Sequence, residues 1–220
     1  MPILNSIVGW LNIKRMSQIN LMRKYPAEVQ METFLRLINQ ASSTEWGRNH
    51  QYREIKTYAQ YCERVSVQTY DDIKPWVDRM RNGETELLWP GEIKWFAKSS
   101  GTTADKSKFI PVTDESLEEC HFRGGKDVMA IYNDNYPNNN YLSGKALTMG
   151  GSHQINENKE SFYGDLSAIL IQNMPFWTHF IRTPNKETIL IEEFEQKIEK
   201  MISNTINENV TGLAGVPSWM

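Results

Sequence analysis

The sequence predicts an α/β protein, in which a mainly helical region over residues 1–90 leads into a mixed α/β region over residues 91–220. Apolar residues recur at helical spacing in the first region, whereas short apolar segments with strand character alternate with helical segments in the second. The 220 residues are 40% hydrophobic and carry a net charge of −3. This composition indicates a folded chain with a sizeable core, and it argues against an acidic disordered protein and a basic nucleic-acid surface.

The first region is expected to hold several amphipathic helices. The opening stretch lacks a leading basic residue and is interrupted by polar residues, so it does not fit a secretory signal. A further helix is expected to begin near Pro26, and another covers residues 71–81 and is closed by Gly83. The apolar residues that share one face of the opening helix are Ile3, Leu4, Ile7, Val8 and Leu11.

The second region alternates short strands with helices. One strand contains Pro111, which has no N–H to donate to a neighbouring strand. The Asn-rich stretch 133–140 is expected to be a surface loop, and the charged run 192–197 is expected to be the solvated face of a helix. Strands are expected at residues 93–97, 109–112, 146–149 and 210–213, and helices at 114–132 and 191–202.

Cysteine content and hydropathy indicate the compartment. Cys62 and Cys120 are far apart and have no metal-ligand spacing, so a disulfide-stapled secreted scaffold is not expected and a cytoplasmic location is. No stretch approaches the roughly 18 apolar residues of a membrane span. We therefore expect no membrane and no nucleic acid among the partners.

A hydroxyl-rich segment between two predicted strands carries the chemistry. It reads Ser-Ser-Gly-Thr-Thr-Ala-Asp-Lys-Ser-Lys over residues 99–108. Gly101 allows close approach of the backbone, hydroxyls donate to phosphate oxygens, and lysine supplies a positive charge. The segment is not a Walker A loop, because no Gly-Lys-Ser/Thr follows at the required spacing. The residues by themselves leave two interpretations open, a phosphate-binding loop or a polar turn of a hairpin.

The string from Ser99 to Pro111 resembles the first nucleotide-binding motif of the auxin-responsive GH-three family, whose members are acyl acid–amido synthetases of the adenylate-forming superfamily. The similarity extends over most of the chain and is to the N-terminal part of bacterial members. Further strings that carry it are Leu88-Trp89-Pro90-Gly91, Phe96-Ala97-Lys98, Met149-Gly150-Gly151-Ser152, Gly164-Asp165-Leu166-Ser167 and Ala214-Gly215-Val216-Pro217-Ser218-Trp219.

The resemblance implies a large N-terminal α/β domain followed by a smaller, mobile C-terminal lid domain. It also implies an ATP-dependent ligase that uses Mg²⁺, forms an acyl-adenylate from a small carboxylic acid and then transfers the acyl group to an amino acid. The residues that it assigns to the ATP phosphates are Ser99, Ser100, Gly101, Thr102, Thr103 and Lys108. It assigns no catalytic residue and no metal ligand within these 220 residues.

The chain departs from the family pattern at Asp105 and in the motifs that it lacks. Asp105 stands where plant-type members usually carry glycine, and Lys106 beside it can offset its charge. The later motifs for adenine, ribose and metal do not occur in residues 1–220, nor does the lid domain. We therefore expect a truncated, incomplete α/β domain that is inactive alone. The alternatives are a non-catalytic nucleotide- or acyl-binding protein on the same scaffold, and a helical interaction module with an incidental Ser/Thr turn.

Other candidate residues favour structural roles. Cys120 and His121 are adjacent on a predicted helix and therefore do not face each other as a nucleophile and base. His153 is a candidate for the pocket wall, and Arg123 and Lys126 are candidates for the acyl carboxylate, although a solvated helix face is the preferred interpretation of those two. We expect the Gly-Asp pair at 164–165 to be a turn or a helix N-cap, and none of the four histidines has metal-ligand spacing.

Overall fold

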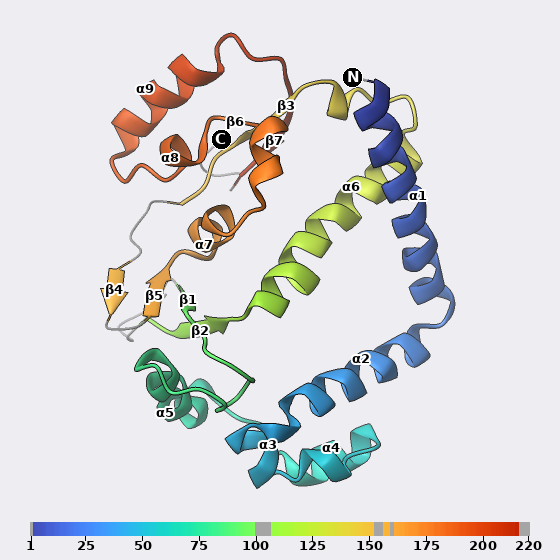
Figure 1. The fold of residues 1–220 in the computed structure, drawn as a ribbon, viewed down its shortest axis with the longest axis vertical. Helices are drawn as coiled ribbons and strands as arrows, with labels where there is room; N and C mark the ends of the chain where they lie inside the picture. Colours follow the sequence, from blue (N-terminus) through green and yellow to red (C-terminus); the bar gives the residue numbers. More distant parts are fainter. Residues whose placement is uncertain (1, 100–106, 152–155, 159–160, 216–220) are drawn as a thin grey trace. The chain divides into compact units, whose positions relative to one another are not determined.

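The computed structural model describes residues 2–99, 107–151, 156–158 and 161–215, with no description of the side chains of residues 2–9 and 156–158 (Figure 1). The chain divides into two compact bodies. The first consists of Met1–Ser17, Asp114–Asn156 and Tyr163–Met220, and the second of Gln18–Thr113 and Glu157–Phe162. The predicted α/β class is confirmed.

A proline separates the first two helices. Helix α1 covers Pro2–Lys24 and helix α2 covers Pro26–Gln40. The residue before a proline is disfavoured in the helical region, and Tyr25 accordingly has φ −129° and ψ 59°. Pro26 then takes the first helical position of α2, where its missing N–H costs nothing. The predicted helix start at Pro26 is confirmed.

Short helices in the second body begin at threonine caps. Helix α3 covers Glu45–Asn49, α4 covers Tyr58–Arg64 and α5 covers Tyr70–Arg81. Thr44 is fully buried, accepts a bond from the Gly47 N–H at 3.0 Å and donates to the Ala41 carbonyl at 2.7 Å. Single 3₁₀ turns lie at η1 (Ala41–Ser43) and η2 (Tyr52–Glu54).

The helices of the second body enclose a core rich in aromatic residues. Burial raises the pKa of the Tyr52 hydroxyl to about 12, and that hydroxyl accepts a 3.0 Å hydrogen bond from the Trp46 indole. The buried members are Ile38, Ala41, Tyr52 and Ile55, and the partly buried residues packed against them are Phe34, Trp46, Tyr61, Val65 and Trp89.

Within the described residues, four strands form a sheet in the order β2-β1-β5-β4. The strands are β1 (Trp95–Lys98), β2 (Phe109–Val112), β4 (Asn156–Asn158) and β5 (Ser161–Gly164). Strands β1 and β2 are antiparallel, with Trp95 opposite Val112 and Lys98 opposite Phe109. The predicted strand pair flanking the hydroxyl-rich segment is confirmed, and Pro111 lies on an edge strand, where its missing N–H leaves no ladder bond unmade.

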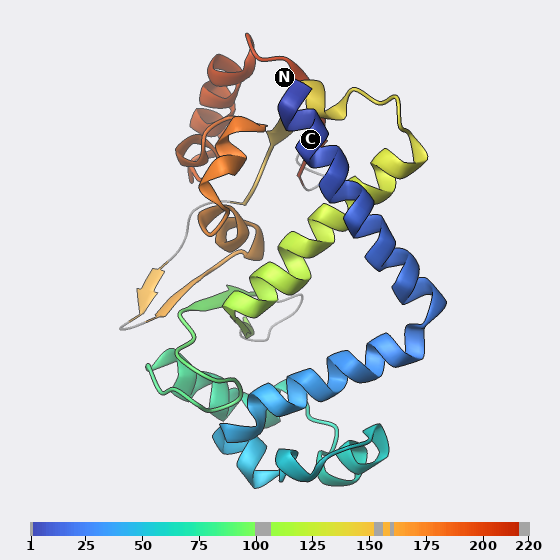
Figure 2. The ribbon, with the colours of Figure 1, turned by 45° about the vertical axis from the view of Figure 1, so that its right-hand side comes forward.

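A parallel sheet lies in the described part of the first body (Figure 2). Strand β3 (Lys145–Thr148) runs between β6 (Arg182–Thr183) and β7 (Val210–Ala214) and is parallel to both. Helices α8 (Lys186–Ile189) and α9 (Phe194–Thr205) connect β6 to β7. A buried cluster of Ala168, Ile171, Ile189 and Leu190 joins α8 to α7 (Leu166–Gln172).

The helix predicted over 114–132 and the loop predicted over 133–140 are only partly correct. A π-helical segment, η3 (Ser116–Phe122), precedes α6, which covers Arg123–Asn135. The side-chain amides of Asn133 and Asn135 each donate at 2.9 Å to the carbonyl four residues earlier. Helix α6 therefore extends to Asn135, within the Asn-rich stretch. Short turns follow at η4 (Tyr141–Ser143) and, later, η5 (Phe176–Phe180).

Two further observations concern the cysteines and the length of the helices. Cys62 and Cys120 are both free thiols and both exposed. None of the helices in the described part of the chain combines the length and the apolarity that crossing a bilayer requires.

An ion pair in the first body yields a pH-dependent stability prediction. The Arg15 guanidinium holds both carboxylate oxygens of Asp127, with one N···O distance of 2.8 Å, and lowers the pKa of that carboxyl. A lowered folded-state pKa stabilises the fold above the unfolded pKa of about 3.9, and that stabilisation is lost as the pH falls through the folded value. We expect Asp127→Asn to destabilise the protein by about 1 kcal/mol at pH 7 and by nearly nothing at pH 2.

Urea unfolding at pH 7 and at stepwise lower pH measures this difference. The control is Asp134→Asn, which removes an exposed carboxylate from the same helix. A cost for Asp127→Asn that stays constant down to pH 2 contradicts the prediction.

Candidate phosphate site

The hydroxyl-rich segment lies between the paired strands β1 and β2, and the structure describes both of its ends. The Ser99 N–H donates to the Lys108 carbonyl at 2.9 Å, and the Lys108 N–H donates to the Ser99 hydroxyl oxygen at 3.2 Å. Of the predicted phosphate ligands, Ser99 and Lys108 are thus brought together. The remaining ligands, Ser100, Gly101, Thr102 and Thr103, lie outside the described residues, as do Asp105 and Lys106.

The geometry of the two ends suits an anion. The Ser99 hydroxyl accepts a bond, which leaves its own proton able to donate. Lys108 and Lys98 are exposed, so both ammonium groups are accessible from solvent. No group of three or more His, Cys, Asp or Glu side chains arranged to hold a metal ion occurs among the residues that the structure describes. Hydroxyl and ammonium donors of this kind suit the oxygens of an anion such as phosphate.

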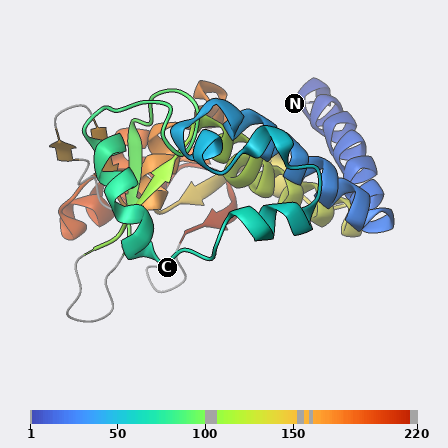
Figure 3. The same ribbon diagram turned by 90° about the horizontal axis from the view of Figure 1, so that it is seen from below.

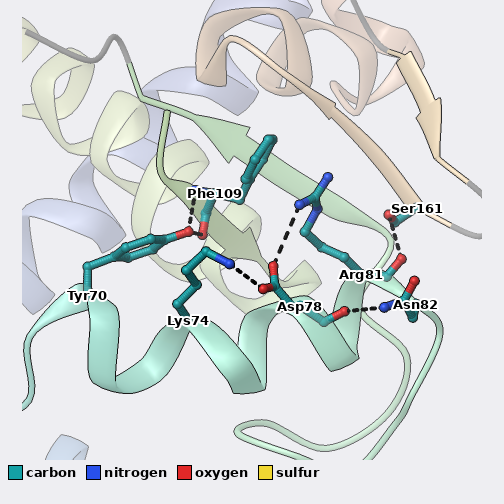
Figure 4. A network of polar contacts seen from close by, with 7 residues as sticks. All are labelled: Tyr70, Lys74, Asp78, Arg81, Asn82, Phe109 and Ser161. Atoms are coloured by element: carbon teal, nitrogen blue, oxygen red, sulfur yellow. Dashed lines mark hydrogen bonds and ion pairs between the residues drawn. The ribbon is translucent and has the colours of Figure 1, made fainter. Parts of the chain in front are cut away.

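Tyr70 contacts the hairpin from α5 and was missed by sequence reasoning (Figure 4). Its hydroxyl accepts a bond from the Phe109 N–H at 2.8 Å and lies 3.5 Å from the Phe109 carbonyl oxygen. The Lys108 ammonium lies 5.5 Å from the centre of its ring. Tyr70 and Phe109 are 39 positions apart, so no local pattern predicts the contact. The one sequence signal is its place at the start of a predicted helix.

Other residues of α5 also make polar contacts, both within the helix and with the neighbouring strands. Figures 3 and 4 show α5 beside β1 and β2. Lys74 and Arg81 both pair with Asp78, and the Arg81 guanidinium lies 3.7 Å from the centre of the Phe109 ring. The Ser161 hydroxyl of β5 donates to the Arg81 carbonyl at 3.0 Å. Phe109 is thus contacted from both ends of α5.

The solvated face expected over residues 192–197 is only partly correct. Residues 192–196 are exposed, whereas Lys197 is buried, with 5% exposure. Its ammonium donates to the Gly150 carbonyl at 3.2 Å. Burial lowers the pKa of Lys197, and attraction to Asp165 partly opposes this shift. Glu193 caps α9 by accepting bonds from the Glu195 and Gln196 N–H groups.

The other candidates that the structure describes comprise a stacked ring, a helix cap and exposed side chains. The His50 ring stacks on Trp46 at 4.2 Å, and Asp165 is the N-cap residue of α7, as expected for the Gly-Asp pair. Cys120, Arg123 and Lys126 are exposed. His153 lies outside the described residues.

The fold and this hairpin define the class as an α/β domain with a hydroxyl-rich segment between two paired strands. The family model described as the GH3 family N-terminal domain matches residues 15–216. The chain belongs to the GH3 family.

Curated relatives are plant enzymes. The chain is 29% identical over 108 residues to the indole-3-acetic acid-amido synthetase GH3.2 of Arabidopsis thaliana, covering 49% of this chain and 20% of that protein. It is 31% identical over 131 residues to the jasmonoyl–L-amino acid synthetase JAR6 of Nicotiana attenuata, covering 57% of this chain and 21% of that protein. The chain thus spans about one fifth of the length of these relatives. The similarity to bacterial members stays a prediction.

Solved structures support the fold. The GH3.15 acyl acid amido synthetase superposes with a TM-score of 0.71 at 17% identity, covering 84% of this chain and 32% of that one. A complex of AtGH3.15 with 2,4-DB gives a TM-score of 0.62 at 19% identity, covering 73% of this chain and 28% of that one. The predicted fold, part of a larger N-terminal α/β domain, is confirmed.

Proposed function

We propose that the protein carrying this chain is an ATP-dependent acyl acid–amido synthetase, and that the β1–β2 loop holds the phosphates of ATP. The observation that carries the proposal is the pairing of Ser99 with Lys108 at 2.9 and 3.2 Å, which closes the loop whose sequence resembles the family motif. Membership of the GH3 family supports the reaction class. The proposed phosphate ligands are Ser99, Ser100, Gly101, Thr102, Thr103 and Lys108.

The proposed reaction has two steps. A carboxylate oxygen of the acid attacks the α-phosphorus of ATP, the bond to the bridging oxygen breaks, and pyrophosphate leaves. The amine nitrogen of an amino acid then attacks the acyl carbon, AMP leaves with the bonding electrons, and the nitrogen loses a proton. The loop contributes hydroxyl and N–H donors and the Lys108 charge, which orient the phosphates and stabilise the charge of the transition state. Mg²⁺ bound with the nucleotide would neutralise part of the phosphate charge.

The substrates are proposed as a small carboxylic acid and an amino acid. The named relatives conjugate indole-3-acetic acid or jasmonate, and we carry over only the class of the acid. We propose a cytoplasmic location, because both exposed cysteines are free and ATP is available there.

ATP–pyrophosphate exchange by the intact protein tests the proposal. We expect exchange that depends on a carboxylic acid from a panel of aryl, indolyl and alkyl acids, followed by amide formation when amino acids are added. Binding of ATP without exchange across the panel supports the non-catalytic alternative instead. We expect no exchange from residues 1–220 alone, so exchange by that fragment contradicts the assignment of adenine and metal ligands to other parts of the protein.

A further inference from the structure

We propose that Tyr70 is a positioning residue for the ATP polyphosphate, which it serves by holding Phe109 through its hydroxyl and Lys108 through its ring. This inference rests on the proposed function, since it gives Lys108 its role at the phosphates. The sequence motif places the phosphate ligands only in residues 99–108. The inference adds Tyr70, a residue of α5, to this site.

The Tyr70 hydroxyl bonds to the backbone of β2 directly after the loop. Ser99 and Lys108 bond to each other across the hairpin, and in an antiparallel pair the next residues, Lys98 and Phe109, turn their backbone groups outward. Among the strands that the structure describes, β2 lies at the edge of its sheet. The Tyr70 hydroxyl accepts this bond at 2.8 Å. The next residue of β2 whose backbone groups face away from β1 is Pro111, which has no N–H. The N–H that Tyr70 binds is therefore the one on this edge that lies beside the loop.

The ring contact acts on the adjacent residue. The Lys108 ammonium lies 5.5 Å from the centre of the Tyr70 ring, within the range of a cation–π attraction. Lys108 is exposed and its four-carbon stem is flexible, so an attraction at one face of the ammonium narrows the positions that it samples. One side chain therefore constrains both the backbone that ends the loop and the charge proposed to meet the phosphates.

Tyr70 is itself held in place. It is the first residue of α5, and the Asp72 carboxylate accepts bonds from the Thr69 N–H at 2.8 Å and the Thr69 hydroxyl at 2.7 Å. These bonds lower the pKa of Asp72 and fix the start of the helix. At the other end of α5, the Arg81 guanidinium packs on the Phe109 ring at 3.7 Å (Figure 4). The helix is thereby anchored to the same residue at both ends, which gives Tyr70 a rigid base.

The test separates the hydroxyl from the ring. Equilibrium dialysis of the intact protein measures Kd for ATP and for AMP in Tyr70→Phe, Tyr70→Leu, Lys108→Met and the double variant Tyr70→Leu/Lys108→Met. We expect Tyr70→Phe to weaken ATP binding by about three- to tenfold, and Tyr70→Leu to weaken it further, with less than twofold change for AMP. In the Lys108→Met background, we expect Tyr70→Leu to weaken ATP binding no more than Tyr70→Phe does in the wild-type protein.

The matched control is Tyr25→Phe, which removes the hydroxyl of a tyrosine that also carries a lysine over its ring, with Lys24 at 5.1 Å. We expect ATP binding to be unchanged in this variant. A second measurement is hydrogen–deuterium exchange of residues 107–112, which we expect to be faster in Tyr70→Phe and unchanged in Tyr25→Phe.

The outcomes distinguish this inference from the proposed function. Equal loss of ATP and AMP affinity in Tyr70→Phe, or no loss while Lys108→Met weakens ATP binding, overturns the positioning role alone. Absence of ATP binding in the wild-type protein, or unchanged ATP affinity in Lys108→Met, overturns the proposed function and the inference with it.

Discussion

Replacing Lys108 by alanine is expected to lower kcat/KM for adenylation by about 10- to 150-fold or more. The substitution removes a full positive charge from the end of the loop proposed to hold the phosphates, and a hydrogen bond to a charged group contributes roughly 1.5–3 kcal/mol. Ser100→Ala is expected to fall in the same range, because the motif places this hydroxyl beside Gly101. Adenylation kinetics of the intact protein measure both effects.

The same segment offers matched controls. Lys106→Ala and Ser107→Ala remove the same kinds of group, but we assign Lys106 only to offsetting Asp105 and Ser107 to the turn before Lys108. Each variant is first checked for folding by circular dichroism. If Lys106 and Ser107 are the sensitive positions while Lys108 and Ser100 tolerate alanine, then our alignment of the loop to the phosphates is wrong.

The largest loss of stability is expected from Gly47→Ala in α3. A Cβ atom at position 47 lies 2.0 Å from the Ala41 carbonyl oxygen and 3.1 Å from the Ser42 Cα, and both neighbours are backbone atoms. The same turn contains the Thr44 cap, whose bonds to Gly47 and Ala41 leave it little freedom to move. We expect a destabilisation of about 3 kcal/mol, from overpacking together with loss of the cap.

Urea unfolding of the intact protein measures this cost, and Gly124→Ala is the control. Position 124 lies within α6, and a Cβ atom there meets nothing within 4 Å. The same change is therefore expected to stabilise the protein by up to about 1 kcal/mol, because alanine is the better helix former. Two variants of equal stability would falsify the assignment of steric crowding at Gly47.

The sequence by itself determined the elements whose signals are local. Pro26 marked the break between α1 and α2, because a proline restricts the residue before it. Alternation of apolar and hydroxyl-rich segments marked the strands β1 and β2 on either side of residues 99–108. The family motif then identified the loop as a candidate site. Each of these inferences depends on residues that are neighbours along the chain.

Only the tertiary structure decided which residues distant in the sequence form hydrogen bonds with those elements. The contact of Tyr70 with Phe109 spans 39 positions, and that of Lys197 with Gly150 spans 47. In the sequence both residues belong to polar helical stretches, for which a solvated face is the default. Burial of a lysine, or a hydrogen bond from an outward N–H to a tyrosine hydroxyl, depends on which backbone groups a distant segment places nearby. A backbone carbonyl or N–H that is away from water costs free energy when it makes no hydrogen bond. A side chain that reaches such a group and bonds to it therefore stabilises the fold.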